Sequence, residues 1–317
     1  MVRTDFDEEL ALVFEEAASV IAAFPPHLAA YGLKLLDRAH PLREAGDTNS
    51  LFGLLPFWLR ERWDVPLRAC RDLAVGNVFL TLHFSLLDDA MDAAVPGSDG
   101  PRTALPFGQL CQEAFRERYG RCDCAPSLLW ARYREYVADW AASVSLEGQE
   151  GRRADPRNPK RLAGKAAPLK VCAAGILLMA GRREELPALE EAMDLALAVL
   201  QLADDWADWR DDLAGDGADA SAFLVLVREK LALPDGEPLM ERAVKQAIYR
   251  HQVLDLLADQ AEAYAGRLRS NPSVAKPLVD YTAALAAGIR RDARRADEAA
   301  AALALEGGWS YFLSNIL

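Results

Sequence analysis

Apolar residues recur with the period of an α-helix along most of the chain, and this pattern constrains the fold more than any other feature. Ile and Thr, two residues that favour strands, occur only five times each among 317 residues, while Ala and Leu dominate. The sequence therefore predicts an all-α protein. The predicted helical segments are residues 8–24, 67–94, 127–146, 167–180, 186–213, 241–268 and 277–305.

Proline and glycine collect in the breaks between these segments, at residues 25–26, 94–101, 147–165 and 271–272. The chain shows no repeat of fixed period and no low-complexity linker that would separate independent domains. We therefore expect one domain over residues 1–317, a single large helical bundle.

The net charge of the chain is −12, from 48 Asp and Glu against 36 Lys and Arg, which argues against nucleic-acid binding through a basic surface. The densest apolar stretch, residues 171–181, is far shorter than the ~20 residues that a membrane-spanning helix requires. The acidic start of the chain is unlike a secretory signal, and the five cysteines have no paired spacing. We expect a cytoplasmic protein with reduced thiols and no transmembrane segment.

The first acidic motif closes an apolar helical run in the sequence LHFSLLDDAMDAA. Asp88 and Asp92 lie one turn apart on the same face of the predicted helix, and Asp89 is next to Asp88. Two like charges so placed repel each other unless a cation lies between them, and a hard divalent ion that prefers carboxylate oxygens meets that need. The alternative interpretation is a solvated helix end that runs into the loop at Pro96 and Gly97.

The second acidic motif lies in the sequence LALAVLQLADDWADWRDDLAGDG. Asp204, Asp208 and Asp212 recur every four residues and form one stripe on the predicted helix. Aliphatic residues precede them on that face, as expected where an apolar cavity opens at a charged mouth. A second apolar stripe, which includes Trp206 and Trp209, lies about 130° away. In the alternative interpretation the tryptophan stripe packs in the core and the aspartates face water.

The two motifs reinforce each other, because both close long apolar helical runs and 116 residues separate Asp88 from Asp204. Two facing carboxylate clusters would form a site for several magnesium ions. Mg²⁺ binds few protein carboxylates and completes its coordination with water and phosphate oxygens, so the implied ligand is a phosphate or diphosphate ester. The cavity beneath would hold the apolar part of that ligand.

With both motifs in view, the chain resembles the class I isoprenoid synthases, which include trans-prenyltransferases, squalene and phytoene synthases, and terpene cyclases. DDAMD at residues 88–92 resembles the aspartate-rich first motif of prenyltransferases and cyclases. VLQLADDWADWRDD is similar to the prenyltransferase FQxxDDxxD, to the cyclase DDxxSxxxE and to the QLxxxxRDxxxD of squalene and phytoene synthases. The resemblance covers roughly residues 70–215 and implies an all-α bundle of the isoprenoid synthase type with a central cavity.

The resemblance also implies the chemistry. Three Mg²⁺ ions would bind an allylic diphosphate, whose loss leaves a carbocation in a dry pocket, and the metal charge would stabilise the leaving group. The catalytic residues would be Asp88, Asp89, Asp92, Asp204, Asp208 and Asp212. The metal ligands would be Asp88, Asp92, Asp204, Asp208 and Asp212.

Seven Lys and Arg residues lie between residues 147 and 170 of this acidic chain. A solvated basic loop explains them, and so does a diphosphate clamp, in which Arg offers paired donors and Lys a point charge. Lys165 stands at about the distance before the second motif where prenyltransferases place a diphosphate-binding lysine, although Ala166 replaces the usual threonine. The diphosphate-binding residues implied are Arg161, Lys165 and Gln201.

Departures from the family patterns favour one branch. The basic segment upstream and the Arg-Arg-Gly after the first motif, both typical of chain-elongating prenyltransferases, are not visible. We therefore expect a terpene synthase that ionises one linear prenyl diphosphate and releases diphosphate by cyclisation or elimination. The alternatives are a prenyltransferase, by chain elongation or head-to-head condensation, and a noncatalytic synthase-like subunit. This prediction is compatible with a homodimer.

Overall fold

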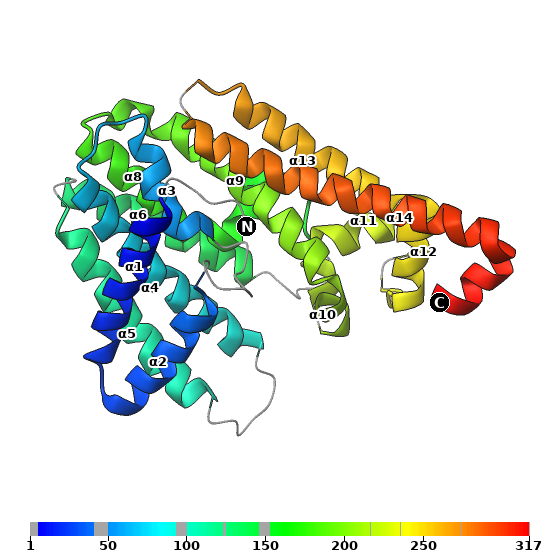
Figure 1. Ribbon diagram of the computed structural model, residues 1–317, viewed down its shortest axis with the longest axis horizontal. Helices are drawn as coiled ribbons and strands as arrows, with labels where there is room; N and C mark the ends of the chain where they lie inside the picture. The colour runs from blue at the N-terminus through cyan, green and yellow to red at the C-terminus, as the bar shows by residue number, and fades with distance from the viewer. Residues whose placement is uncertain are drawn as a thin grey trace. The chain divides into compact units, whose positions relative to one another are not determined.

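The computed structural model of the protein is helical throughout its regular parts (Figure 1). It describes residues 6–40, 50–92, 100–122, 125–145, 153–215, 217–234, 236–272 and 274–316. Within these ranges every regular element is an α-helix or a short 3-10 helix, and none is a strand. This confirms the prediction of an all-α protein, which rested on the helical period of the apolar residues.

The chain divides into two compact units. Unit 1 consists of Met1–Glu135 and Pro168–Pro187, and unit 2 consists of Tyr136–Ala167 and Ala188–Leu317. Two helices begin in unit 1 and end in unit 2, namely α6 (Pro126–Val144) and α9 (Leu186–Ala207). A single domain over residues 1–317 with a central cavity stays a prediction.

Unit 1 is built around α4 (Leu67–Asp92), which packs against α1, α3, α5 and α8. Asn77 of α4 is fully buried. Its Nδ2 donates to the Phe52 carbonyl at 2.8 Å, and its Oδ1 accepts from the Tyr119 hydroxyl at 2.6 Å. A buried amide is costly unless its donor and acceptor are used, so Asn77 fixes α4 against α3 and α5. The other helices of this unit are α1 (Asp7–Ala22), α2 (Pro26–Arg38), α3 (Ser50–Arg60), α5 (Gly100–Gly120), α8 (Lys170–Met179) and the 3-10 helix η2 (Arg183–Glu185).

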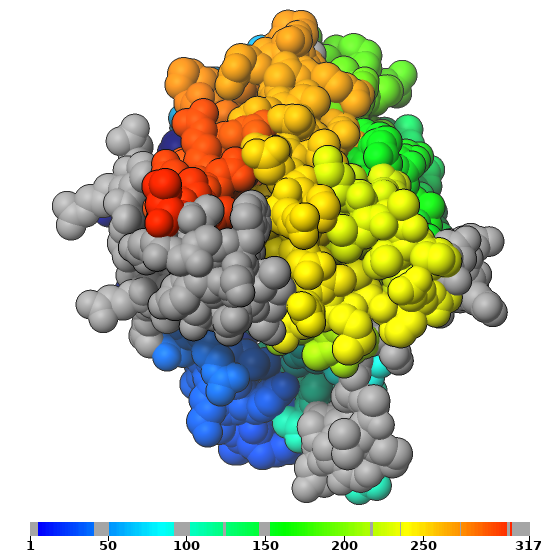
Figure 2. Space-filling view, turned by 90° about the vertical axis from the view of Figure 1, so that its right-hand side faces the viewer, coloured from blue at the N-terminus to red at the C-terminus, as the bar shows by residue number. Residues whose placement is uncertain are grey.

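Unit 2 contains the side-by-side pair α13 (Val253–Arg269) and α14 (Lys276–Ile316) (Figure 1). α11 (Ala222–Leu231) packs on α13 and on α12 (Glu241–His251). Figure 2 shows α12, in yellow, next to α14, in orange to red, on one face of the unit. Three short elements complete the unit and contribute residues to the candidate site. They are α7 (Pro159–Leu162), α10 (Trp209–Ala214) and η3 (Gly217–Asp219).

The 3-10 helix η1 (Ala163–Leu169) joins α7 to α8. Together, Pro159–Met179 is long and apolar enough for a membrane helix, but 78% of its most apolar window is buried inside the protein. A buried core helix meets the same criterion, so this segment is weak evidence for a membrane span. The four cysteines that the structure describes, at positions 70, 111, 122 and 172, are buried, while Cys124 lies outside the described residues.

The predicted helices at residues 8–24, 67–94, 127–146 and 277–305 are confirmed as α1, α4, α6 and α14. The prediction of unbroken helices at 186–213 and 241–268 is wrong. The first divides at Asp208 into α9 and α10, and the second divides at Gln252, whose φ of +52° is left-handed. Helices α2, α3, α5 and α11 fall outside the predicted segments. In α3 and α5 an internal proline, Pro56 or Pro106, interrupts the helical pattern.

Candidate functional site

The first acidic motif occupies the C-terminal end of α4, in unit 1. Asp88 and Asp89 are exposed, and the side chain of Asp92 lies outside the described part of the chain. The last turn of α4 contains no basic residue, although the negative end of the helix dipole favours cations there. Burial raises the pKa of the Tyr31 hydroxyl, and the charge of nearby Asp89 raises it further. The positive charge of Arg38 acts in the opposite direction.

The second acidic motif spans the junction of α9 and α10, in unit 2. The Asp208 amide donates to the Asp204 carbonyl at 2.9 Å, and the Asp212 amide donates to the Asp208 carbonyl at 3.1 Å. These bonds keep the three residues on successive turns, although Asp208 has left helical geometry, with φ −105° and ψ 12°. Asp208 is exposed, whereas Asp204 and Asp212 are half-buried. The predicted stripe survives, but it crosses a break in the helix.

The pKa of the Asp212 carboxyl shows which charges act at this junction. Burial raises its pKa above the usual range, and the negative charges of Asp208 and Asp211 raise it further. The positive charge of Lys165 acts in the opposite direction. Carboxylates that repel one another in a half-buried place favour a bound cation, so Lys165 meets part of this demand within unit 2.

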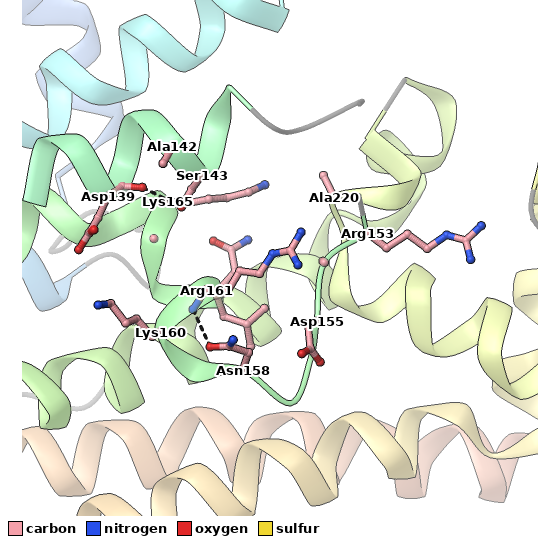
Figure 3. Close-up of a pocket in the computed structure, with 14 residues that line it drawn as sticks. Asp139, Ala142, Ser143, Arg153, Asp155, Asn158, Lys160, Arg161, Lys165 and Ala220 are labelled. Carbon is pink, nitrogen blue, oxygen red and sulfur yellow. Dashed lines mark hydrogen bonds between the residues drawn. The ribbon is translucent and has the colours of Figure 1, made fainter. Parts of the chain in front are cut away.

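A basic pocket of about 770 Å³ lies in unit 2. Its lining includes all three residues predicted to bind diphosphate, Arg161, Lys165 and Gln201. Figure 3 shows the side chains of Lys165 and Arg161 extending into the same open space, opposite Ala220. The other lining residues are Asp139, Ala142, Ser143, Arg153, Ala154, Asp155, Asn158, Lys160, Leu162 and Gly164. Two converging cations of this kind suit a phosphate-bearing ligand.

The other two cations of the pocket point elsewhere. Figure 3 shows Lys160 and Arg153 extending to opposite sides, away from the space that Lys165 and Arg161 share. The Arg153 Nε donates to the Asp219 carboxylate at 3.1 Å, so its charge is already paired. Of these four cationic side chains, Lys165 and Arg161 are therefore the two that extend into the open space.

The segment at residues 153–158 forms one wall of the pocket and is held at several points. The Ala154 amide donates to the Asp219 carbonyl at 2.7 Å. Arg157 makes two hydrogen bonds to Glu229 of α11, and the Tyr264 hydroxyl of α13 donates to the Pro156 carbonyl at 2.8 Å. Hydrogen bonds of this kind hold a loop that has no sheet or helix of its own.

The start of α7 and η1 positions the two cations. The Asn158 side chain caps α7 by accepting from the Arg161 amide at 3.1 Å. Gly164, directly before Lys165, lies against Ser143 of α6, and a Cβ there would overlap Ser143 Oγ. Glycine permits this close approach without a shift of Ser143 or of the backbone next to Lys165.

Asp205 is a residue of this site that the sequence interpretation did not select. Its side chain is 4% exposed. Oδ1 accepts from Gln201 Nε2 at 2.8 Å, and Oδ2 accepts from the Ala222 backbone amide at 2.6 Å. Burial raises its pKa to about 6, against the hydrogen bonds and the charge of Lys165, which favour ionisation. At 100° per residue Asp205 falls beside Leu202 and Trp209 on the apolar stripe. A carboxylate among apolar residues was the feature of the sequence that could have identified it.

The structure thus brings together part of the predicted site. Arg161, Lys165 and Gln201 line one pocket, and Lys165 acts on the pKa of Asp212. Asp88, Asp89 and Asp92 belong to the other unit, so their meeting with the second motif stays a prediction.

The side chains of the second motif have the right chemistry for magnesium, because they offer only carboxylate oxygens and repel one another. Among the described residues, no three His, Cys, Asp or Glu side chains are grouped closely enough to hold a metal ion by themselves. A Mg²⁺ ion that takes most of its ligands from water and phosphate fits such a site.

Comparison with solved structures shows that the fold is similar to that of a known protein. The structure is similar to that of a geranylgeranyl pyrophosphate synthetase from the archaeon Geoglobus acetivorans, with a TM-score of 0.69 over 90% of this chain and 96% of that chain. The chain has the isoprenoid synthase fold. The two sequences are 18% identical, so the likeness is one of fold. No known protein family and no curated protein matches the sequence.

Proposed function

We propose that this isoprenoid synthase-fold protein is a magnesium-dependent enzyme that binds a linear prenyl diphosphate and transfers its prenyl group. The observation that carries the proposal is the pocket of unit 2, where Arg161, Lys165 and Gln201 meet beside the second acidic motif. The structural likeness to a geranylgeranyl pyrophosphate synthetase supports transfer over the single-substrate reaction that the sequence favours.

The side chains divide the work by charge. Lys165 and Arg161 extend into one space and would take the terminal oxygens of the diphosphate, Arg161 through paired donors and Lys165 as a point charge. Lys165 also acts electrostatically on Asp212, so a ligand held by Lys165 would lie next to the carboxylates of the second motif. These fixed charges stabilise the leaving group where negative charge develops.

The residues that would hold magnesium are Asp204, Asp208 and Asp212 of the second motif together with Asp88 and Asp92 of the first. When bound, magnesium would neutralise the diphosphate and make it a better leaving group. The buried aliphatic residues that precede the second motif on α9, Met193, Leu197 and Leu200, would keep water from the apolar chain.

A terpene synthase is the second candidate function. It is favoured by the sequence after the first motif, AAVPGSDG, which lacks the basic residues that a second diphosphate would require. It needs only one anion site, and the pocket of unit 2 supplies one pair of cationic side chains that extend into its open space.

The test is incubation with Mg²⁺ and the C10, C15 or C20 prenyl diphosphate, each with and without isopentenyl diphosphate. Elongated products that form only when both substrates are present support prenyl transfer. A hydrocarbon or alcohol formed from one substrate alone supports the terpene synthase. No diphosphate release with any substrate would contradict both and favour a noncatalytic subunit.

A further inference from the structure

The second Asp of the ADD sequence at residues 203–205 differs from its neighbours in the second motif. Asp208 is exposed and Asp204 and Asp212 are half-buried, whereas Asp205 is 4% exposed and uses both carboxylate oxygens in hydrogen bonds to the protein. A buried carboxylate stays only where partners replace water. We propose that Asp205 is a positioning residue, which orients Gln201 and ties together the walls of the basic pocket, and not a magnesium ligand.

The first tie is to Gln201. An ionised carboxylate only accepts hydrogen bonds, so the Gln201 atom 2.8 Å from Asp205 Oδ1 is the amide nitrogen. This fixes which way round the amide lies and leaves its carbonyl oxygen and second N–H for other partners. Because Gln201 lines the pocket, Asp205 decides which polar atoms of that amide face a ligand.

The second tie is to the start of α11. Ser221 is the N-cap of this helix, but its side chain makes no capping hydrogen bond. Asp205 supplies the missing acceptor from 17 residues away, since Oδ2 accepts from the Ala222 amide at 2.6 Å. A carboxylate at a helix N-terminus is also favoured by the helix dipole. Asp205 therefore anchors α9 to the first residue of α11.

This anchor reaches the opposite wall of the pocket. Ala220, two residues before Ala222, lines the pocket. Asp219, just before it, accepts from the Ala154 amide through its carbonyl at 2.7 Å and from Arg153 Nε through its carboxylate at 3.1 Å. Ala154 and Arg153 line the pocket too. A continuous path thus runs from Gln201 through Asp205 and residues 219–222 to the segment at 153–154.

The path gives Asp205→Asn an unusual expected effect. Removing a negative charge next to Lys165 should, by electrostatics alone, make the pocket attract anions more strongly. The Ala222 amide can only donate, so the oxygen of an asparagine at position 205 must face it and the nitrogen must face Gln201. Gln201 then has to turn over to keep its bond, and the pocket loses its native arrangement of donors. Positioning therefore predicts weaker anion binding, and simple charge removal predicts tighter binding.

The experiment measures inorganic pyrophosphate binding to the full chain by calorimetry without divalent metal, for the wild type, Asp205→Asn, Asp205→Ala and the control Asp211→Asn. Asp211 is exposed and near the same motif, so its variant removes the same charge without a buried bond. We expect Asp205→Asn to remain folded by circular dichroism and to bind pyrophosphate about tenfold more weakly, as for one misplaced hydrogen bond to a charged group. Asp211→Asn should bind as tightly as the wild type or slightly more tightly.

A second readout separates positioning from metal binding. This readout is the Mg²⁺ concentration for half-maximal turnover, and it rests on the proposed function. The concentration should be unchanged in Asp205→Asn and raised in Asp208→Asn. Unchanged or tighter pyrophosphate binding in Asp205→Asn, no binding by the wild type, or a magnesium shift as large as that of Asp208→Asn would each overturn the inference. If the wild type shows no turnover, the proposed function fails and the pyrophosphate result alone decides the role of Asp205.

Discussion

The two acidic motifs share a spacing and differ in their surroundings. The first lies at the C-terminal end of the 26-residue α4, where Asp88 and Asp89 are exposed and the last turn holds no basic residue. The second lies where α10 begins, with Asp211 and Asp212 in its first turn and Lys165 acting on Asp212. The dipole of α4 opposes the first arrangement, whereas in the second the dipole of α10 favours Asp211 and Asp212, although Asp204 lies in the last turn of α9. Equal spacing in the sequence therefore does not give equal roles, because the neighbours set the charge balance.

The largest expected effect comes from removing one carboxylate of each motif. Asp88→Ala and Asp208→Ala should each abolish turnover of a prenyl diphosphate, because each removes a predicted magnesium ligand. Both side chains are exposed and Asp208 makes no side-chain cap, so the thermal midpoint should change little. Steady-state assays and thermal denaturation measure both properties. Asp211→Ala is the control, and full activity in either test variant would remove that residue from the site.

A smaller effect is expected from removing Lys165, the cation that acts on the second motif. Lys165→Ala should weaken pyrophosphate binding by roughly ten- to a hundredfold, because a charge-assisted bond is lost. Lys276→Ala is the matched control, since Lys276 is 83% exposed and pairs with Asp280 one turn away. Equal binding by the two variants in calorimetry would place the anion elsewhere.

Gly164→Ala tests the support beneath that cation. The added Cβ would overlap Ser143 Oγ and approach Ser143 Cβ to 3.0 Å, so Ser143 or η1 must shift. We expect a loss of about 1–3 kcal/mol in unfolding free energy together with weaker pyrophosphate binding. Gly266→Ala is a suitable control, because a Cβ at Gly266 meets no atom within 4 Å. Chemical denaturation would contradict this account if both variants were equally stable.

The smallest expected effect is on the pH dependence of folding stability, through His83 of α4. His83 is buried, its Nδ1–H donates to the Gly108 carbonyl at 2.9 Å, and burial lowers its pKa below 6.5. The unfolded chain therefore binds a proton at a higher pH than the folded chain, and stability falls as the pH drops below 6.5. One proton limits this slope to about 1.4 kcal/mol per pH unit.

The comparison is made with His83→Gln, which cannot take up that proton. Denaturation curves at several values between pH 7 and pH 5 should fall less steeply for this variant than for the wild type. Parallel pH profiles would show that His83 does not resist protonation in the folded protein.

Much of the fold follows from the sequence, because helical periodicity and the scarcity of Ile and Thr act locally. The break at Gln252 could not be predicted from the sequence, since no glycine or proline marks its left-handed backbone conformation. In the site, Arg161, Lys165 and Gln201 line one pocket, and their role in diphosphate binding stays a prediction. Asp205 was missed because its role depends on Ala222, which is distant in sequence and contributes only a backbone amide. Side-chain patterns carry no signal of such a partner.

The central claim is that both acidic motifs act on one metal-bound diphosphate. A double-mutant cycle on Asp88→Ala and Asp208→Ala, with Mg²⁺-dependent pyrophosphate binding as the readout, tests it directly. We expect strong coupling, so that the double variant binds hardly more weakly than either single variant. Losses that simply add would show two independent sites and contradict the account.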